Sequence, residues 1–259
     1  MKQVNVLETP ILYASDVIYW LDGSSAQSAS DMQRINSELV LQLDTRPTDL
    51  QLLHTRGKTV LWRRADGKIV AGNAEDADKQ RSESDTFMIS GIVSDLQRRY
   101  IPRRFSLEVG DSAGHQLELY PTPLGTRLGR GGALQGTLRL VDGITPVPWA
   151  MMTLIVDLTV GDDLIIHAQA DEHGDFVIAM HRLPPLLESV EHYSATLSIR
   201  ASIEATADEP VDPADLVSMR LGSIDVEDSF ADAISLFVVP GSIGLIRSFE
   251  RDHVVVQPS

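Results

Sequence analysis

The first half of the chain contains short clusters of β-branched and aromatic residues separated by turn residues, which is the pattern of β-strands. One strand is expected at Val17–Trp20, ending at Asp22-Gly23, and another at Leu39–Leu43, ending at Arg46-Pro47. A further short strand is expected at Ile11–Tyr13. The polar stretch 24–36 between them predicts either a loop or one short helix.

The pattern continues to residue 120. Thr59–Trp62 and Lys68–Val70 flank a turn that ends at Gly67, which predicts a hairpin. Residues 72–84 have few apolar and many charged side chains, so we expect a surface loop there. Further strands are expected at residues 87–93, 104–109 and 115–120.

Three segments in the second half carry the most specific pattern. Gly136 stands in Leu-Gln-Gly-Thr-Leu and is expected to open a strand, and residues 146–150 read Pro-Val-Pro-Trp-Ala before an apolar run. Residues 168–176 read Ala-Gln-Ala-Asp-Glu-His-Gly-Asp-Phe. In that turn Gly174 can adopt a positive φ, Asp171 can accept backbone N–H bonds, and Phe176 can anchor the next strand in the core.

In this order the three segments resemble the carboxypeptidase regulatory-like domain, a transthyretin-like β-sandwich, over roughly residues 133–203. The resemblance implies an accessory, non-catalytic domain that acts as a rigid spacer or a binding module. The acidity around the segments departs from the family pattern.

The tail after residue 230 predicts a hairpin about Pro240-Gly241. Several of its positions are apolar on both faces, with Phe237 and Ile243 among them. Such a strand is either buried within the chain or offered to a neighbouring molecule at a sheet edge.

These elements predict an all-β protein of two β-sandwich-like domains with short strands and Pro/Gly-rich turns. The N-terminal domain is expected at residues 1–124, a glycine-rich linker at 125–132, and the sandwich with its hairpin extension at 133–259. Gly91 and Gly136, each followed by a similar strand entry, form an internal echo that suggests two units of one kind.

Charge is divided unequally along the chain. Residues 1–130 hold 16 Lys and Arg and 17 Asp and Glu, a net charge of −1, whereas residues 131–259 hold 6 and 20, a net charge of −14. An acidic half repels nucleic acid, so binding of DNA or RNA there is not expected. This polarity suits docking against a partner of complementary charge, although it also fits ordinary solubilising charge.

Composition limits the chemistry and the compartment. The chain has no cysteine, so a disulfide, a thiol nucleophile and a thiolate zinc site are excluded. Neither a secretory signal nor an apolar run of membrane-spanning length is visible, since Asp157 and Gly161 interrupt the longest run. We therefore expect a cytoplasmic protein, or part of a particle assembled in the cytoplasm, without membrane insertion.

One catalytic pattern occurs in the sequence. Gly110-Asp-Ser-Ala-Gly114 satisfies G-x-S-x-G, but a nucleophile elbow needs a helix after the serine. A predicted strand follows here, and His54 lacks the context of a protease histidine, so we interpret the segment as a hairpin turn. No catalytic residue is predicted.

Metal and cofactor sites are not predicted either. His167, Asp171 and His173 share strand parity, but Asp171 begins the turn described above and no zinc-binding histidine spacing is present. Calcium at Asp162-Asp163, or at Asp171, Glu172 and Asp175, lacks the ligand spacing of a known loop. Surface histidines on a sandwich edge explain the pattern more simply.

The strongest candidate for binding is a cationic segment. Arg98, Arg99, Arg103 and Arg104 fall within seven residues, together with Tyr100. Arginine forks bind carboxylates bidentately, and arginine with tyrosine is typical of interface hot spots. The segment is either a solvated turn or a docking surface for an acidic partner or the acidic half of a second copy.

Three classes of function remain. The first is a non-catalytic structural or adaptor subunit of a multi-subunit protein assembly; small proteins with such a domain resemble accessory components of phage tails and contractile injection particles, such as baseplate, collar or cap proteins. Its expected partner-binding residues are Arg98, Arg99, Tyr100, Arg103, Arg104, Phe237 and Ile243. The second is a sugar- or peptide-binding module, for which three tryptophans are a thin supply. The third, an enzyme, lacks recognisable residues.

Overall fold

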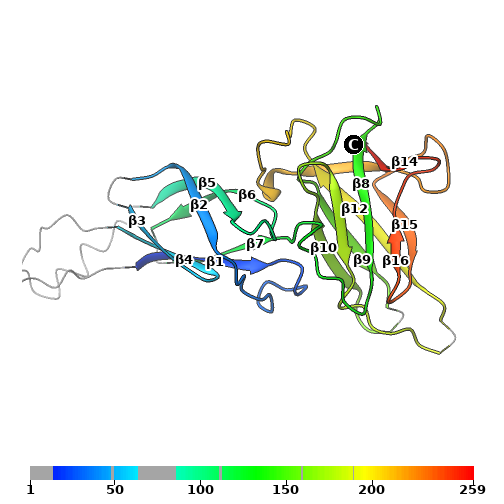
Figure 1. The fold of residues 1–259 in the computed structure, drawn as a ribbon, viewed down its shortest axis with the longest axis horizontal. Coiled ribbons are helices and arrows are strands. Elements are labelled where there is room, and N and C mark those ends of the chain that lie inside the picture. The colour runs from blue at the N-terminus through cyan, green and yellow to red at the C-terminus, as the bar shows by residue number, and fades with distance from the viewer. Residues whose placement is uncertain (1–13, 48–49, 64–85, 111–112, 159, 189) are drawn as a thin grey trace, which may run out of the picture.

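The computed structural model describes residues 14–47, 50–63, 86–110, 113–158, 160–188 and 190–259. The described chain is almost entirely β-structure and contains one short 3₁₀ helix, η2 (Pro213–Asp215). Figure 1 shows two β-lobes side by side along the long axis, the N-terminal lobe in blue to cyan-green and the C-terminal lobe in green to red. The predicted all-β fold with several sheets is confirmed.

The N-terminal lobe is built from two sheets. One has the order β3 (Leu50–Thr55), β4 (Lys58–Arg63), β1 (Ala14–Asp22), β7 (Gly114–Leu119), and the other has the order β2 (Leu39–Thr45), β5 (Phe87–Asp95), β6 (Arg103–Val109). Their alternating apolar side chains form one buried cluster. Trp20 of β1 meets Phe105 of β6 edge to face, with ring centroids 6.0 Å apart, so the cluster joins the two sheets.

The G-x-S-x-G segment connects these two sheets. β6 and β7 lie in different sheets, and β7 pairs in parallel with β1, so the expected hairpin turn is wrong. The buried carboxylate of Asp16 accepts the backbone N–H groups of Gly110 (2.6 Å) and Ala113 (3.0 Å) and thereby fixes the crossing. Residues 111 and 112 lie outside the described residues.

The C-terminal lobe is one ten-stranded sheet that folds over its own core. Its order is β10 (Leu164–Gln169), β9 (Met151–Val156), β12 (Tyr193–Ala201), β13 (Val217–Gly222), β17 (Val254–Pro258), β8 (Ala133–Leu140), β11 (Asp175–Ala179). The short strands β14 (Phe230–Ala231), β15 (Ala233–Val238) and β16 (Ile243–Leu245) pair with β13, β12 and β8 respectively. The buried cluster of this lobe takes side chains from nearly all of these strands and none from the first lobe.

The turn before β11 has the predicted geometry. Gly174 has a φ of +80°, and the Asp171 carboxylate accepts the backbone N–H groups of His173 (2.9 Å) and Asp175 (3.0 Å). Phe176 is fully buried and packs against Gly136, where a Cβ atom would lie 2.9 Å from the ring. Gly136 lies in the middle of β8 rather than at its start, because this close approach is what requires the glycine.

The tail forms the predicted turn but not the predicted hairpin. Ser242 N–H donates to Val239 O across Pro240-Gly241, and Gly241 has a φ of +84°. β15 nevertheless pairs with β12, and β16 pairs with β8. The turn therefore carries the chain from one wall of the folded sheet to the other.

The remaining predictions concern the loop at 24–36, the internal echo and three segments of the N-terminal half. The stretch 24–36 is a loop without a helix, and β3 was not predicted. β5 pairs with β6, whereas β8 does not pair with β9, so the two halves of the internal echo have different strand pairing. The expected strand at 11–13, the hairpin about Gly67 and the loop at 72–84 lie outside the described residues.

Candidate functional site

The cationic segment lies where the two lobes meet, in the connection from β5 to β6. Its first part is a tight turn in which the buried carboxylate of Asp95 accepts the backbone N–H groups of Gln97 (3.1 Å) and Arg99 (3.0 Å). Arg98 is exposed and has a φ of +52°. Of the side chains that follow, Arg99 and Tyr100 bond to the N-terminal lobe, whereas Arg103 and Arg104 reach carboxylates of the C-terminal lobe.

Arg103 bridges the lobes in a largely buried position. Its guanidinium donates to Glu118 O (2.9 Å) and to the Asp212 carboxylate (3.2 Å), and the Arg103 and Asp212 side chains are each 13% exposed. Asp212 also caps the helix η2 by accepting the N–H of Ala214. A small apolar cluster of Tyr120, Met151 and Leu216 packs at the same junction.

Arg104 makes a second, more exposed bridge. It donates to the Asp44 carboxylate of β2 and to the Glu209 carboxylate, both at 2.8 Å. Its backbone N–H donates to Val211 O at 3.2 Å. The cationic segment was expected to dock, as one alternative, on the acidic half of a second copy. In the structure Glu209 and Asp212 of that half bind the segment within the same chain.

The loop 204–213, which carries Glu209 and Asp212, is held in place by a hydrogen bond from Trp149. Trp149, which is buried and has a φ of +60°, donates its indole N–H to Thr206 O at 2.7 Å. Its own carbonyl accepts the side-chain amide of Gln169. Trp149 therefore links the Pro-Val-Pro-Trp-Ala segment to the loop 204–213 at the lobe junction.

Arg99 and Tyr100 face a cleft of about 600 Å³ between the lobes. The Arg99 guanidinium donates to Ser37 Oγ (2.5 Å), and the Tyr100 hydroxyl donates to the Asp22 carboxylate (2.9 Å). Burial, together with the Asp22 carboxylate, raises the pKa of Tyr100 well above its ordinary value. On the opposite side His181 follows β11, and partial burial of its imidazole, reinforced by Arg182, lowers its pKa.

Phe237 and Ile243 lie on an exposed apolar surface of the C-terminal lobe. We call the four exposed side chains around the β15–β16 turn the tail patch: Phe237 (68% exposed), Val239 (41%), Ile243 (59%) and Leu245 (58%). Ile234 and Val238 of β15 point the other way and are buried. His192 packs on Phe237, with ring centroids 4.1 Å apart.

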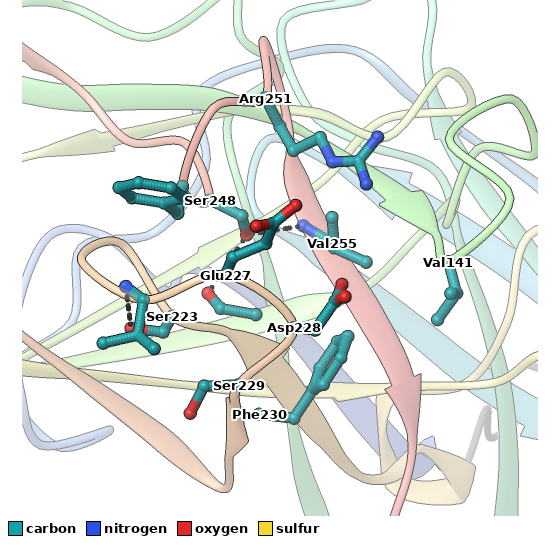
Figure 2. A pocket seen from close by; sticks show the side chains of 12 residues that line it. Val141, Ser223, Glu227, Asp228, Ser229, Phe230, Ser248, Arg251 and Val255 are labelled. Carbon is teal, nitrogen blue, oxygen red and sulfur yellow. Dashed lines mark hydrogen bonds between the residues drawn. The ribbon is translucent and has the colours of Figure 1, made fainter.

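A smaller hollow of about 40 Å³ lies between the β13–β14 connection and the chain before β17, with room for a few water molecules. Figure 2 shows the side chains that line it, with Glu227 and Asp228 on the β13–β14 connection and Arg251 on the facing segment. At its base, Ser248 Oγ donates to Gly222 O and accepts the N–H of Val255 (both 3.0 Å). The hollow is too small for an organic ligand.

The histidines considered for metal binding are not gathered by the fold. Nδ1 of His167 lies 3.1 Å from the Thr153 hydroxyl, and the Asp171 carboxylate is engaged in its turn. No group of three or more possible metal ligands occurs in the part of the chain that the structure describes. Nor does that part contain a helix long and apolar enough to cross a bilayer.

Some residues of the cleft and of the tail patch were not predicted from the sequence. Arg34 and Arg127 line the cleft from the loop after β1 and from the connector between the lobes, and neither stands in a recognisable motif. Val239 and Leu245 extend the tail patch. The apolar residues on either side of Pro240-Gly241 were the available signal for the patch; the cleft has no comparable signal in the sequence.

Comparison with known proteins adds little to this geometry. No protein-family model matches the chain, and no curated protein matches it. Among solved structures, the Bacillus anthracis TIE protein aligns with 94% of this chain at 10% identity and a TM-score of 0.26. The chain spans 34% of that structure, and a likeness at this score carries no argument about fold or function.

Proposed function

We propose that this protein is a non-catalytic structural or adaptor subunit of a larger protein assembly. The observation that supports the proposal is the tail patch, where four large apolar side chains are between 41% and 68% exposed on two consecutive strands and the turn between them. Large apolar side chains that remain exposed close together along the chain are typical of protein–protein contacts.

The strand edge at the tail patch supports the same proposal. By contrast, the outer edge of β10 is bonded at its centre, since Ile165 N–H donates to Gln27 Oε1 (3.3 Å) and Ile165 O accepts from Arg182 (2.6 Å). β15 pairs with β12 on one side, and within the described chain no strand pairs with its other edge. An extended segment of a partner could add to this edge and cover Phe237.

The finer assignment to a phage tail or contractile injection particle rests on the resemblance to the carboxypeptidase regulatory-like domain. In such a particle the protein would be a baseplate, collar or cap accessory, assembled in the cytoplasm. Among the arginines, the exposed Arg98 is the one best placed for an external partner, because Arg103 and Arg104 already bind carboxylates of their own chain. Docking through the cationic segment stays a prediction.

A sugar-binding module that uses a tryptophan platform fits less well. Trp20 and Trp149 are buried in the two lobes, and Trp62 of β4 is half-buried. Ligand binding therefore has to be argued from the cleft instead.

The test is rate-zonal sedimentation of native lysate at low and high salt, comparing the wild type with the double variant Phe237→Ser and Ile243→Ser. We expect the wild type to migrate in a large particle with defined companions, and the variant to migrate as a free 28.4 kDa chain. Leu96→Ser with Val217→Ser is the matched control, since both residues are 61% exposed away from the patch. Migration of the wild type as a free chain at both salt concentrations, or a variant that stays in the particle, would contradict the proposal.

A further inference from the structure

The cleft between the lobes is formed by four segments. The loop after β1 supplies Arg34 and Ser37, the β5–β6 connection supplies Arg99, the connector between the lobes supplies Arg127, and the end of β11 is followed by His181. Its volume of about 600 Å³ falls in the range of pockets that hold small organic ligands.

Positive charge dominates the cleft although the chain as a whole carries a net charge of −15. Arg34, Arg99 and Arg127 line it, and Asp22 is the one carboxylate among its described lining residues. The Asp22 carboxylate is already engaged, because it accepts the N–H (3.0 Å) and the hydroxyl (2.6 Å) of Ser24 as well as the Tyr100 hydroxyl. These donors are neutral, so Asp22 keeps its charge, and the lining carries three arginines against one carboxylate, a net charge of +2.

The guanidinium groups retain unused donors. For Arg34 and Arg127, no hydrogen bond or ion pair of the side chain is found with any part of the chain that the structure describes. Arg34 is held by stacking, with its guanidinium carbon 4.7 Å from the Tyr19 ring centroid, which leaves its N–H edges available. Arg99 is held in place on one side, because its Nε is buried 3.8 Å from the Asp95 carboxylate and one terminal nitrogen donates to Ser37 Oγ.

Neutral polar side chains complete the lining. Gln33 and Asn36 provide side-chain amides, whereas the hydroxyls of Ser25 and Thr126 already donate to Asp22 O and Thr122 O and can only accept from a ligand. Arginine forks match the geometry of carboxylates, and hydroxyl and amide groups match the hydroxyls of a ligand.

From this arrangement we infer that the inter-lobe cleft binds a hydroxylated ligand with two or more carboxylates. More than one carboxylate is expected because the three arginines come from three separate segments. Such chemistry is found in free hydroxy acids and in the uronic acid residues of acidic polysaccharides. This binding is independent of the assembly role and of the tail patch.

The experiment is isothermal titration calorimetry of the full chain at fixed ionic strength with two probes, citrate and a trigalacturonate. Maltotriose is the neutral control for the second probe. We expect saturable binding of at least one acidic probe and none of maltotriose. Binding of citrate alone indicates a free hydroxy acid, and stronger binding of trigalacturonate indicates a polysaccharide.

Variants localise the site. Arg34→Gln and Arg127→Gln should each weaken binding about tenfold, as expected for loss of a charge-assisted hydrogen bond. Both side chains are exposed, so the variants should fold, and their circular dichroism and thermal midpoints verify this. Arg247→Gln makes the same charge change at an exposed position outside the cleft and should leave binding unchanged.

Three results would overturn the inference. The first is the absence of saturable binding by both acidic probes, and the second is equal binding of maltotriose. The third is a loss with Arg247→Gln as large as with the cleft variants, which would show that the probes sense net charge alone.

Discussion

The cationic segment between β5 and β6 and the tail patch on β15 and β16 both have the composition of contact surfaces, but the chain uses them differently. Arg103 and Arg104 of the segment bind Asp212, Glu209 and Asp44 of the same chain. The apolar side chains of the tail patch remain largely exposed. Composition identified both as contact surfaces, and only the fold tells an internal contact from an external one.

The difference has a physical basis. A guanidinium that is largely removed from water needs carboxylate or carbonyl partners, so burial of Arg103 at a lobe junction requires acids nearby. An exposed apolar side chain has no such need within its chain, and covering it by a partner is favourable in proportion to the area removed from water. The first surface therefore stabilises the lobe arrangement, and the second is available for association.

The largest expected effect on the free energy of unfolding comes from a substitution at Gly132, which packs against the turn that carries the tail patch. Gly132 has a φ of +81°, and a Cβ atom there would lie 1.9 Å from Ser242 O in the β15–β16 turn. Gly132→Ala should lower the free energy of unfolding by about 3 kcal/mol, through backbone strain and overpacking together. Urea denaturation measures this loss.

Gly161→Ala is the matched control for that experiment. Gly161 also has a positive φ (+96°), but a Cβ atom there meets nothing within 4 Å. The control should cost about 1 kcal/mol, from strain alone. Equal losses for the two variants would show that the contact with Ser242 is unimportant.

A smaller effect is expected from the two inter-lobe arginines, and the difference between them sharpens the comparison. Arg103→Met leaves the largely buried Asp212 carboxylate without its cation and should cost about 2 kcal/mol in urea denaturation. Arg104→Met should cost less than about 1 kcal/mol, because Arg104 is 32% exposed and Glu209 is 68% exposed. If Arg104→Met were the more damaging change, the junction would not depend on the buried bridge.

The smallest effect concerns pH. Burial lowers the pKa of His167 below its ordinary value of 6.5, so the unfolded chain takes up this proton before the folded chain does. The stability contributed by neutral His167 is fully present above pH 6.5 and is lost as the pH falls through the lowered folded-state pKa. The thermal midpoint of His167→Gln should therefore fall less than that of the wild type between pH 7 and pH 5. Identical pH profiles would count against burial of a neutral imidazole.

The sequence predicted local structure better than pairing. The turn around Gly174 followed from residues in direct succession, and its geometry is as expected. The predicted hairpin about Pro240-Gly241 is wrong, because turn residues specify where the chain reverses but not which strands pair with the two flanking strands. β15 and β16 pair with strands that lie much earlier in the chain, and only packing of the whole lobe selects them.

The same reason limits what could be predicted of the site. The arginines were visible as a cluster, but Arg104 and Glu209 are 105 residues apart and no local pattern joins them. The cleft was invisible for a related reason, since Arg34 and Arg127 come together only when both lobes are in place.

Trp149 offers a further consequence. Its indole bonds the loop 204–213, which carries both acids of the lobe junction, while Trp20 lies in the core of the other lobe. Separation of the lobes would loosen that loop and let water reach the Trp149 ring, shifting its fluorescence emission to longer wavelength while Trp20 stayed shielded. A shift in tryptophan emission would therefore report separation of the lobes without an added label, against a constant contribution from the half-buried Trp62 of β4.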